Sequence, residues 1–503
     1  MAHSAVASYP LVAAFLRQIV ILPDFTTRRF ELMLSPLAFS NFLAFTSSIM
    51  MLLVWRRFGR RHIVVTPYLL ACCFLLLFGW TGQISAILSG STDSIYPAFV
   101  LFAGTATFLA GFWLFKDSQV LPVQLFLKPL VYDKRTNYFN GGLLLLIIVL
   151  AISTYRYQGL PPVTHVIREL ATGRADIDEL ARYSKDARMS LSSGHWTYDT
   201  PQRGNGIAGR FLRIAFPYLL CIALGVYYST RSRLWLYYSV MVGALAIFYV
   251  GGDATRAPLA TASIIVVVFL SFVKPIGVRH LVVTSAVIFA FLVISTMTSS
   301  KGLRQYYESG SVSHIAEAIV TRLGANGVDD VAVIELIQDN QLDYHYGLLF
   351  LEQLLAPIPG VRLQEVPFDL RLYYLIDPYS TDHVFATTTL LGVVYLDGGI
   401  LGVMVAYCLL GVLTAKINRF LASGPKEIAS MAMKASLICA MGRVMLAGVL
   451  YVLVDALLII LVHQAFCWLS RRREGLNHEM GTRGIASRRQ NSQVLIGAGP
   501  VRG

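Results

Sequence analysis

Long apolar segments alternate with polar connectors along almost the whole chain. Eleven of these segments approach the roughly 20 residues that a helix needs to cross a bilayer. They occupy 31–55, 63–88, 97–115, 138–154, 211–229, 234–251, 257–273, 281–298, 391–414, 428–442 and 444–468. Residues 5–22 are also apolar but contain Arg17, so they form either a twelfth span or an amphipathic helix at the membrane surface. The pattern therefore predicts an all-α fold, a polytopic transmembrane helix bundle of 11–12 spans.

The composition agrees with a membrane protein. Hydrophobic residues make up 55% of the 503 positions and charged residues only 14%, whereas soluble domains carry about 25% charged residues. The net charge of +13 does not indicate a nucleic-acid partner, because of where the charges lie. The two long polar loops, 156–210 and 299–385, hold 13 Lys/Arg against 18 Asp/Glu, so the positive excess falls in short connectors and the tail.

Alternate connectors are basic, for example RRFGRRH at 56–62 and KINRFLASGPK at 416–426. The positive-inside rule places such connectors in the cytoplasm and both long loops on the opposite side of the membrane. The larger loop has helical patterns at 311–323, 331–342 and 347–360, which predict a small helical cap lying on the membrane. The predicted organisation is N-terminal spans in 1–154, a first outer loop in 155–210, central spans in 211–298, the large outer loop in 299–385, C-terminal spans in 386–470 and a disordered cytoplasmic tail in 471–503.

Several cationic residues lie close to the predicted outer face. Arg256 interrupts two apolar segments in YVGGDATRAPLA, and Arg304 follows a span. A guanidinium there suits an anionic group such as a phosphate, although pairing with Asp253 or with lipid headgroups is the alternative. Arg362 and Arg371 flank EVPFDL in the large loop and are either substrate contacts or part of a solvated face.

The segment YSTDHVFATTTLLGVVYLDGGILG at 379–402 begins with an ionisable pair at the mouth of an apolar span. His383 titrates near neutral pH and can take a proton from a hydroxyl, and Asp382 can orient a partner or act as the base itself. By position alone, an interfacial loop histidine is the more common interpretation of His383. The glycines between 392 and 402 permit a break or close packing of the span. Asp455, in the last span, is predicted to be a polar partner inside the bundle.

No nucleotide-binding pattern is present, since the chain has neither GxGxxG nor GxxxxGK[ST]. No cluster has the spacing of a metal site. The sequence therefore predicts no cofactor.

Three motifs together resemble the bacterial O-antigen polymerases (Wzy type) and the related O-antigen ligases. The first is the TTLLGVVYLDGGILG segment, whose family pattern falls on Thr388, Gly392, Tyr395, Gly399 and Gly402. The second is GLLFLEQLLAPIPG at 347–360, which looks like a segment common in the polymerases. The third is GGDATRAPL at 251–259, similar to the family's turn with an arginine before a span.

The resemblance implies a glycosyltransferase with a membrane fold related to the GT-C class, located in the bacterial inner membrane with its long loops in the periplasm. Such an enzyme joins undecaprenyl-diphosphate-linked oligosaccharide repeat units, and its partners are that lipid-linked glycan, membrane lipid and a chain-length regulator protein. The resemblance assigns Arg256 and Arg304 to the diphosphate, and His383, with Asp382 as the alternative, to proton transfer. Arg362, Arg371 and Tyr395 are the candidate substrate contacts.

Two alternatives remain open from the sequence. A ligase would use the same parts to move glycan onto another anchor, and the Pro-Ile-Pro of 357–359 favours the polymerase. A transporter or flippase is typically built from inverted repeats with charges buried near the middle of the membrane. Here the ionisable residues lie mostly at the ends of the spans.

Overall fold

The structure is a computed structural model of the 503-residue chain. It describes residues 35–58, 66–88, 90, 92, 94–114, 135–158, 205–250, 256–273, 327–349, 351, 388–422, 426–444, 452 and 455–465. Every regular element among these residues is a helix. The all-α prediction is confirmed for this part of the chain.

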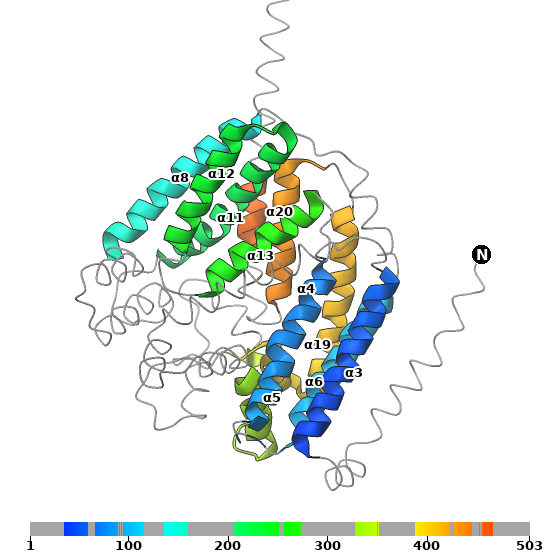
Figure 1. Cartoon of the computed structure of the whole chain (residues 1–503). Helices are drawn as coiled ribbons and strands as arrows, with labels where there is room; N and C mark the ends of the chain where they lie inside the picture. Colours follow the sequence, from blue (N-terminus) through cyan, green and yellow to red (C-terminus); the bar gives the residue numbers. More distant parts are fainter. Residues whose placement is uncertain are drawn as a thin grey trace, which may run out of the picture.

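The first group of helices stands at the lower right of Figure 1. It consists of α3 (Pro36–Phe58), α4 (Pro67–Phe74), the π-helix η2 (Leu75–Trp80), α5 (Thr81–Leu88), α6 (Tyr96–Leu114) and α19 (Leu390–Ala422). Helices α4, η2 and α5 follow one another directly and form one apolar segment. Helices α6 and α19 form the most extensive helix pair in the described structure, although almost 300 residues separate them in sequence.

The second group stands at the upper left of Figure 1 and is arranged around α11. It consists of α8 (Arg135–Gln158), α11 (Asn205–Thr230), α12 (Arg233–Val250), α13 (Arg256–Val273), α20 (Ile428–Arg443) and the helix Asp455–Ala465. Helix α20 joins the two groups because it packs on α4, where Gly442 lies against Leu70 and Phe74. Buried side chains of both groups belong to one hydrophobic core.

Five described helices are long and apolar enough to cross a membrane: Pro36–Trp55, Pro67–Leu88, Tyr96–Leu114, Phe211–Thr230 and Leu390–Asn418. The outward surface of α3 is apolar as well, with Phe42, Phe45, Leu52 and Leu53 exposed. A water-soluble protein rarely exposes such a stripe, whereas lipid requires it. These features identify a helical membrane protein.

The five helices match the predicted spans at 31–55, 63–88, 97–115, 211–229 and 391–414. Three shorter apolar helices, Asn140–Ala151, Ala260–Val273 and Asp455–Ala465, lie inside three further predicted spans. Residues 5–22 and 281–298 are outside the described part, so the total of 11–12 spans stays a prediction. The first predicted loop, 155–210, is shorter than expected, because α8 continues to Gln158 and α11 already begins at Asn205.

Helix α19 contains a sharp break. Gly398 (φ −151°, ψ 15°) and Gly399 (φ 60°, ψ −156°) leave helical geometry. A Cβ on Gly402 would lie 2.9 Å from the carbonyl oxygen of Val394. Eight residues of straight helix rise about 12 Å, so the chain must bend strongly between these positions. The prediction that glycines in this span permit a break or close packing is confirmed.

Candidate functional site

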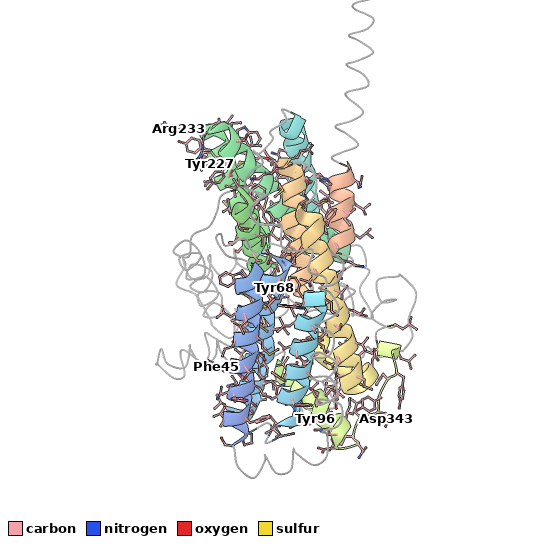
Figure 2. All side chains as sticks on the ribbon, turned by 90° about the vertical axis from the view of Figure 1, so that its right-hand side faces the viewer. Phe45, Tyr68, Tyr96, Tyr227, Arg233 and Asp343 are labelled. Carbon is pink, nitrogen blue, oxygen red and sulfur yellow. The ribbon has the colours of Figure 1, made fainter. Side chains whose placement is uncertain are left out.

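The candidate site lies at one end of the first helix group, where three stretches distant in sequence meet. These are the connection from α5 to α6, residues 327–349 of the large loop, and the start of α19 up to its break. Figure 2 shows labelled residues of two of them, Tyr96 and Asp343, together at the lower end, opposite Tyr227 and Arg233. The sequence placed all three stretches at the outer face, so their meeting is consistent with the predicted topology.

Residues 327–338 form a helix that is built into this end of the bundle. Val331, Val333 and Ile334 on it are buried. The predicted helix at 331–342 therefore exists, and within the described part of the chain it covers residues 327–338. Its apolar face packs into the common core, and the prediction that the loop forms a cap lying on the membrane stays a prediction.

Asp330 joins this helix to the start of α19. Its carboxylate accepts hydrogen bonds from the backbone N–H groups of Thr389 (2.8 Å) and Gly392 (3.1 Å), and from the Thr389 hydroxyl. Thr389 in turn accepts a bond from the N–H of Leu391 at 3.1 Å. The first N–H groups of a helix have no partner inside it, so a carboxylate supplied by another element satisfies them and suits the positive end of the helix dipole.

A second polar contact ties the same helix to the α5–α6 connection. The Thr92 hydroxyl donates to the carboxylate of Glu335. The Thr92 oxygen also accepts a bond from the N–H of Ser94, and the Ser94 oxygen one from the N–H of Tyr96. These bonds fix the start of α6 relative to residues 327–338. The end of the bundle is thus held by side-chain contacts across hundreds of residues of sequence.

Three tyrosines form a cluster beside these contacts. The Tyr395 ring lies 6.4 Å from the ring of Tyr96 in an edge-to-face arrangement and 6.2 Å from the ring of Tyr344. The hydroxyls of Tyr395 and Tyr96 are 3.5 Å apart. Tyr395 is only 1% exposed, whereas Tyr344 is 37% exposed. We call Tyr96, Tyr344 and Tyr395 the tyrosine cluster.

The break in α19 positions Tyr344. The N–H of His345 donates to the carbonyl of Leu396 at 2.9 Å, and the N–H of Leu349 donates to the Asp397 carboxylate at 3.2 Å. A Cβ on Gly399 would lie 3.4 Å from the Tyr344 ring. At the break, the Leu396 carbonyl and the Asp397 carboxylate thus accept hydrogen bonds from residues 345 and 349, and these bonds hold Tyr344 over the buried Tyr395.

We predict that Gly399→Ala destabilises the protein by about 2 kcal/mol, because φ near +60° with ψ near ±150–180° is essentially restricted to glycine. Gly398→Ala is the matched control. Gly398 has a negative φ and free space around its Cβ position. Thermal unfolding in detergent micelles gives the comparison. Equal unfolding temperatures for the two variants would contradict the described backbone at the break.

The stability contributed by Asp330 is expected to depend on pH. Burial raises the pKa of Asp330 to about 7, and the nearby Asp329 adds to this, while the bonds from Thr389 and Gly392 oppose it. The unfolded chain releases this proton near pH 3.9. Between these values the folded state binds a proton that the unfolded state does not, so stability falls as pH rises towards 7.

The measurement is the difference in unfolding temperature between the wild type and Asp330→Asn at pH 5, 6, 7 and 8. The amide does not titrate, so the difference isolates Asp330. We expect the wild type to lose stability relative to the variant as pH rises. A constant difference would show that Asp330 has an ordinary pKa, and a difference of opposite slope would contradict the account as well.

Most residues predicted from the sequence to form the site lie outside the described part: Asp382, His383, Arg304, Arg362 and Arg371. Arg256 is the first residue of α13, and its side chain is not described. Tyr395 is described and belongs to the tyrosine cluster.

The three stretches that form the candidate site, residues 90–96, 327–349 and 388–402, contain no Lys or Arg. Any lysine or arginine that acts at this end therefore comes from another part of the chain.

The sequence prediction missed Asp330, Glu335, Thr92 and Tyr344. Asp330 had a signal that could have been used. It lies three, four and seven residues before Val333, Ile334 and Ile337, so it falls on the apolar face of the helix. A carboxylate on an apolar face needs a buried partner. The local sequence does not indicate which residue is that partner, because Thr389 lies 59 residues away.

A separate ion pair connects α20 with the last described helix. Arg443 Nη1 donates to Asp455 Oδ2 at 2.9 Å. The prediction that Asp455 is a polar partner inside the bundle is confirmed.

Comparison with known proteins finds no match: no protein-family model, curated protein or solved structure is similar to this chain.

Proposed function

We propose that the protein is a polymerase of lipid-linked glycans. It joins undecaprenyl-diphosphate-linked oligosaccharide repeat units into a surface polysaccharide at the periplasmic face of a bacterial inner membrane. In this proposal the chain is a GT-C-like glycosyltransferase of 11–12 spans, and a chain-length regulator is a possible protein partner. The resemblance of three sequence motifs to O-antigen polymerases is the starting point.

The observation that carries the proposal is the tyrosine cluster at the end of an apolar bundle, bordered by carboxylates. Sugar rings have apolar C–H faces and hydroxyl-bearing edges, and tyrosine offers an apolar face with a polar tip. Ligand sites commonly combine aromatic walls with a few placed polar groups. Tyr344 is exposed enough to contact a glycan, and the buried Tyr395 supports it from behind. In this proposal Tyr395 therefore affects substrate binding indirectly, by holding Tyr344 in place.

The proposed reaction is a single glycosyl transfer. The hydroxyl oxygen of an acceptor repeat unit bonds to the anomeric carbon of the donor glycan, and the bond from that carbon to the diphosphate oxygen breaks. The electron pair leaves with undecaprenyl diphosphate, and the hydroxyl proton passes to a base. His383 is the proposed base, with Asp382 as the alternative. Arg256 and Arg304 stabilise the charge on the leaving diphosphate, and Arg362 and Arg371 bind substrate.

One observation favours a second candidate, a transporter. Ion-coupled transporters use interrupted helices and buried acidic residues, and α19 is interrupted at Gly398–Gly399 next to the buried Asp330. Asp330 has three donors from the α19 start, which suits a structural cap equally well. Polymerisation by the purified protein separates transfer from transport, because chain growth in that assay needs no transport step.

The test is a deletion of the gene in the source organism, complemented with wild type, His383→Ala, Arg256→Ala or the control Arg233→Ala at matched membrane levels. Lipid-linked and surface glycans are separated on gels. The proposal predicts that the deletion accumulates single lipid-linked repeats, that wild type and Arg233→Ala restore long chains, and that the two site variants do not. Long chains that remain on their lipid without reaching the final anchor would indicate a ligase. Unchanged glycan would refute glycosyl transfer.

A further inference from the structure

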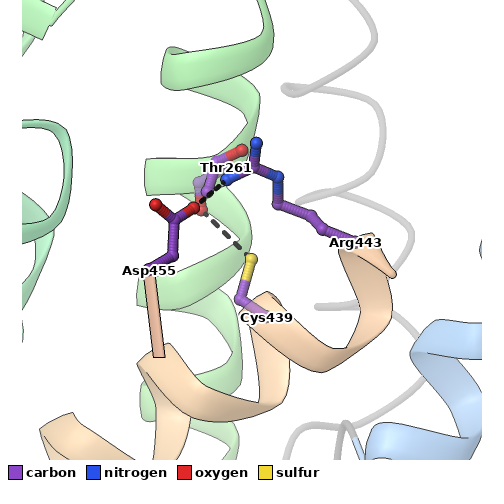
Figure 3. A network of polar contacts seen from close by, with 4 residues as sticks. All are labelled: Thr261, Cys439, Arg443 and Asp455. Carbon is purple, nitrogen blue, oxygen red and sulfur yellow. Dashed lines mark hydrogen bonds and ion pairs between the residues drawn. The ribbon is translucent and has the colours of Figure 1, made fainter. Parts of the chain in front are cut away.

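The Arg443–Asp455 pair lies where three helices meet. Figure 3 shows Arg443 at the end of α20 pointing toward Asp455, which begins the helix Asp455–Ala465, with Thr261 of α13 beside them. The Arg443 side chain is 28% exposed and that of Asp455 13%. The pair is therefore partly buried among apolar helices, and the Arg443 side chain is the more exposed of the two.

Contacts along α13 and α20 establish that these helices run antiparallel. Cys439 Sγ lies 3.7 Å from the carbonyl oxygen of Thr261, and a Cβ on Gly225 would touch both Ile428 and Phe269. Residue numbers therefore rise along one helix as they fall along the other. Arg443 is one turn beyond Cys439, and Arg256 lies little more than one turn before Thr261. The two arginines consequently occupy the same end of the α13/α20 pair.

Packing alone does not explain a charge pair at this place. Taking two charges out of water costs free energy that their attraction barely offsets, and apolar side chains of similar size usually stabilise as well or better. A guanidinium has five N–H donors. Among the described residues, Asp455 is the acceptor that Arg443 contacts, through Nη1. Within the described part of the chain, the other donors of Arg443 contact no acceptor and suit the oxygens of a phosphate ester, which guanidinium groups bind in a bidentate manner.

We infer that Arg443 is an anion-binding residue for the diphosphate of the lipid-linked glycan, and that Asp455 is a positioning residue that holds the guanidinium when no anion is bound. The inference rests on the proposed function. It adds a second cation at the end of the helix pair where Arg256 begins α13. The same chemistry would suit a phospholipid headgroup, so the test must separate the two sources.

The experiment measures binding rather than activity, so that it remains informative if the protein proves not to be a polymerase. The full chain is placed in phosphatidylcholine nanodiscs, and binding of undecaprenyl diphosphate is followed by thermophoresis. The main variant is Arg443→Gln/Asp455→Asn, which keeps a hydrogen-bonded pair without charge. Arg233→Ala is the control, since Arg233 is an exposed arginine at the start of α12.

We expect the neutral pair to fold with an unchanged unfolding temperature and to bind undecaprenyl diphosphate roughly tenfold or more weakly, because a charge-assisted bond is lost. Asp455→Asn alone should bind as tightly as wild type or tighter, because the competing carboxylate is gone. A merely structural ion pair would instead lose binding and stability together in this variant. Equal affinity of the neutral pair and wild type would overturn the inference.

Phosphatidylglycerol, added as a competitor, separates the two sources. If binding of undecaprenyl diphosphate persists in the presence of a large excess of phosphatidylglycerol, the diphosphate lipid is supported as the ligand. Displacement at comparable concentrations, together with weaker phosphatidylglycerol binding by the neutral pair, would overturn that assignment and make Arg443 a headgroup contact.

Discussion

Gly411→Ala will force α6 and α19 apart and destabilise the protein by about 3 kcal/mol. A Cβ at this position would lie 2.2 Å from the carbonyl oxygen of Phe108 and 2.8 Å from the backbone nitrogen of Phe112. Both are backbone atoms, so no side-chain rotation relieves the clash. The approach is reciprocal, since a Cβ on Gly111 would lie 2.2 Å from the carbonyl oxygen of Cys408. Small residues permit such close backbone packing between membrane helices.

The matched control is Gly142→Ala on α8, where nothing lies within 4 Å of the added Cβ. Alanine favours a helix over glycine, so this variant should be as stable as wild type or slightly more so. The measurement is the unfolding temperature of purified protein in detergent, with expression in membranes as a second readout. Equal behaviour of the two variants would mean that α6 and α19 do not meet at these glycines.

Asp330→Ala is expected to cost about 3 kcal/mol and to loosen the start of α19, because buried donors that lose their acceptor cost roughly 1–3 kcal/mol each. The variant leaves the N–H groups of Thr389 and Gly392 and the Thr389 hydroxyl without the carboxylate. Asp330→Asn should cost less, because an amide oxygen can still accept from the backbone. The tyrosine cluster would shift as well, since Tyr395 lies on the turns that Asp330 caps.

Asp339→Ala serves as the control, because Asp339 lies in the same segment and is exposed. Unfolding temperature reports the stability, and protease cleavage in the 388–399 region reports the local loosening. If Asp330→Ala and Asp339→Ala unfold alike, Asp330 does not cap α19.

Hydrophobic patterning located the described helices well, because a membrane helix must be apolar over its whole length. The predicted span at 97–115 corresponds to α6 (Tyr96–Leu114), and that at 428–442 corresponds to α20 (Ile428–Arg443). The sequence also showed that glycines between 392 and 402 could interrupt a span. It could not show that the break falls at Gly398–Gly399, since that depends on how the bend packs against residues 343–349.

The contacts that form the candidate site could not be predicted from the sequence, for a physical reason. Asp330 acts on a helix start 59 residues away, and Glu335 binds Thr92 across 243 residues. Such pairings are determined by tertiary packing, so no local sequence pattern indicates them. Tyr395 was identified through a resembling motif, whereas Tyr344, which lies over it, was not. Arg443 was not predicted as the partner of Asp455, because their pairing across 12 residues depends on how two helices pack.

The most direct test of the account is polymerisation by the purified protein. Full-length protein is reconstituted into liposomes with undecaprenyl-diphosphate-linked repeat units isolated from the source organism, and the products are resolved by length. The account predicts a ladder of longer lipid-linked glycans, with one undecaprenyl diphosphate released for each bond formed, and no ladder with His383→Ala. Folded protein that leaves every repeat unit single, with no undecaprenyl diphosphate released, would contradict the central claim.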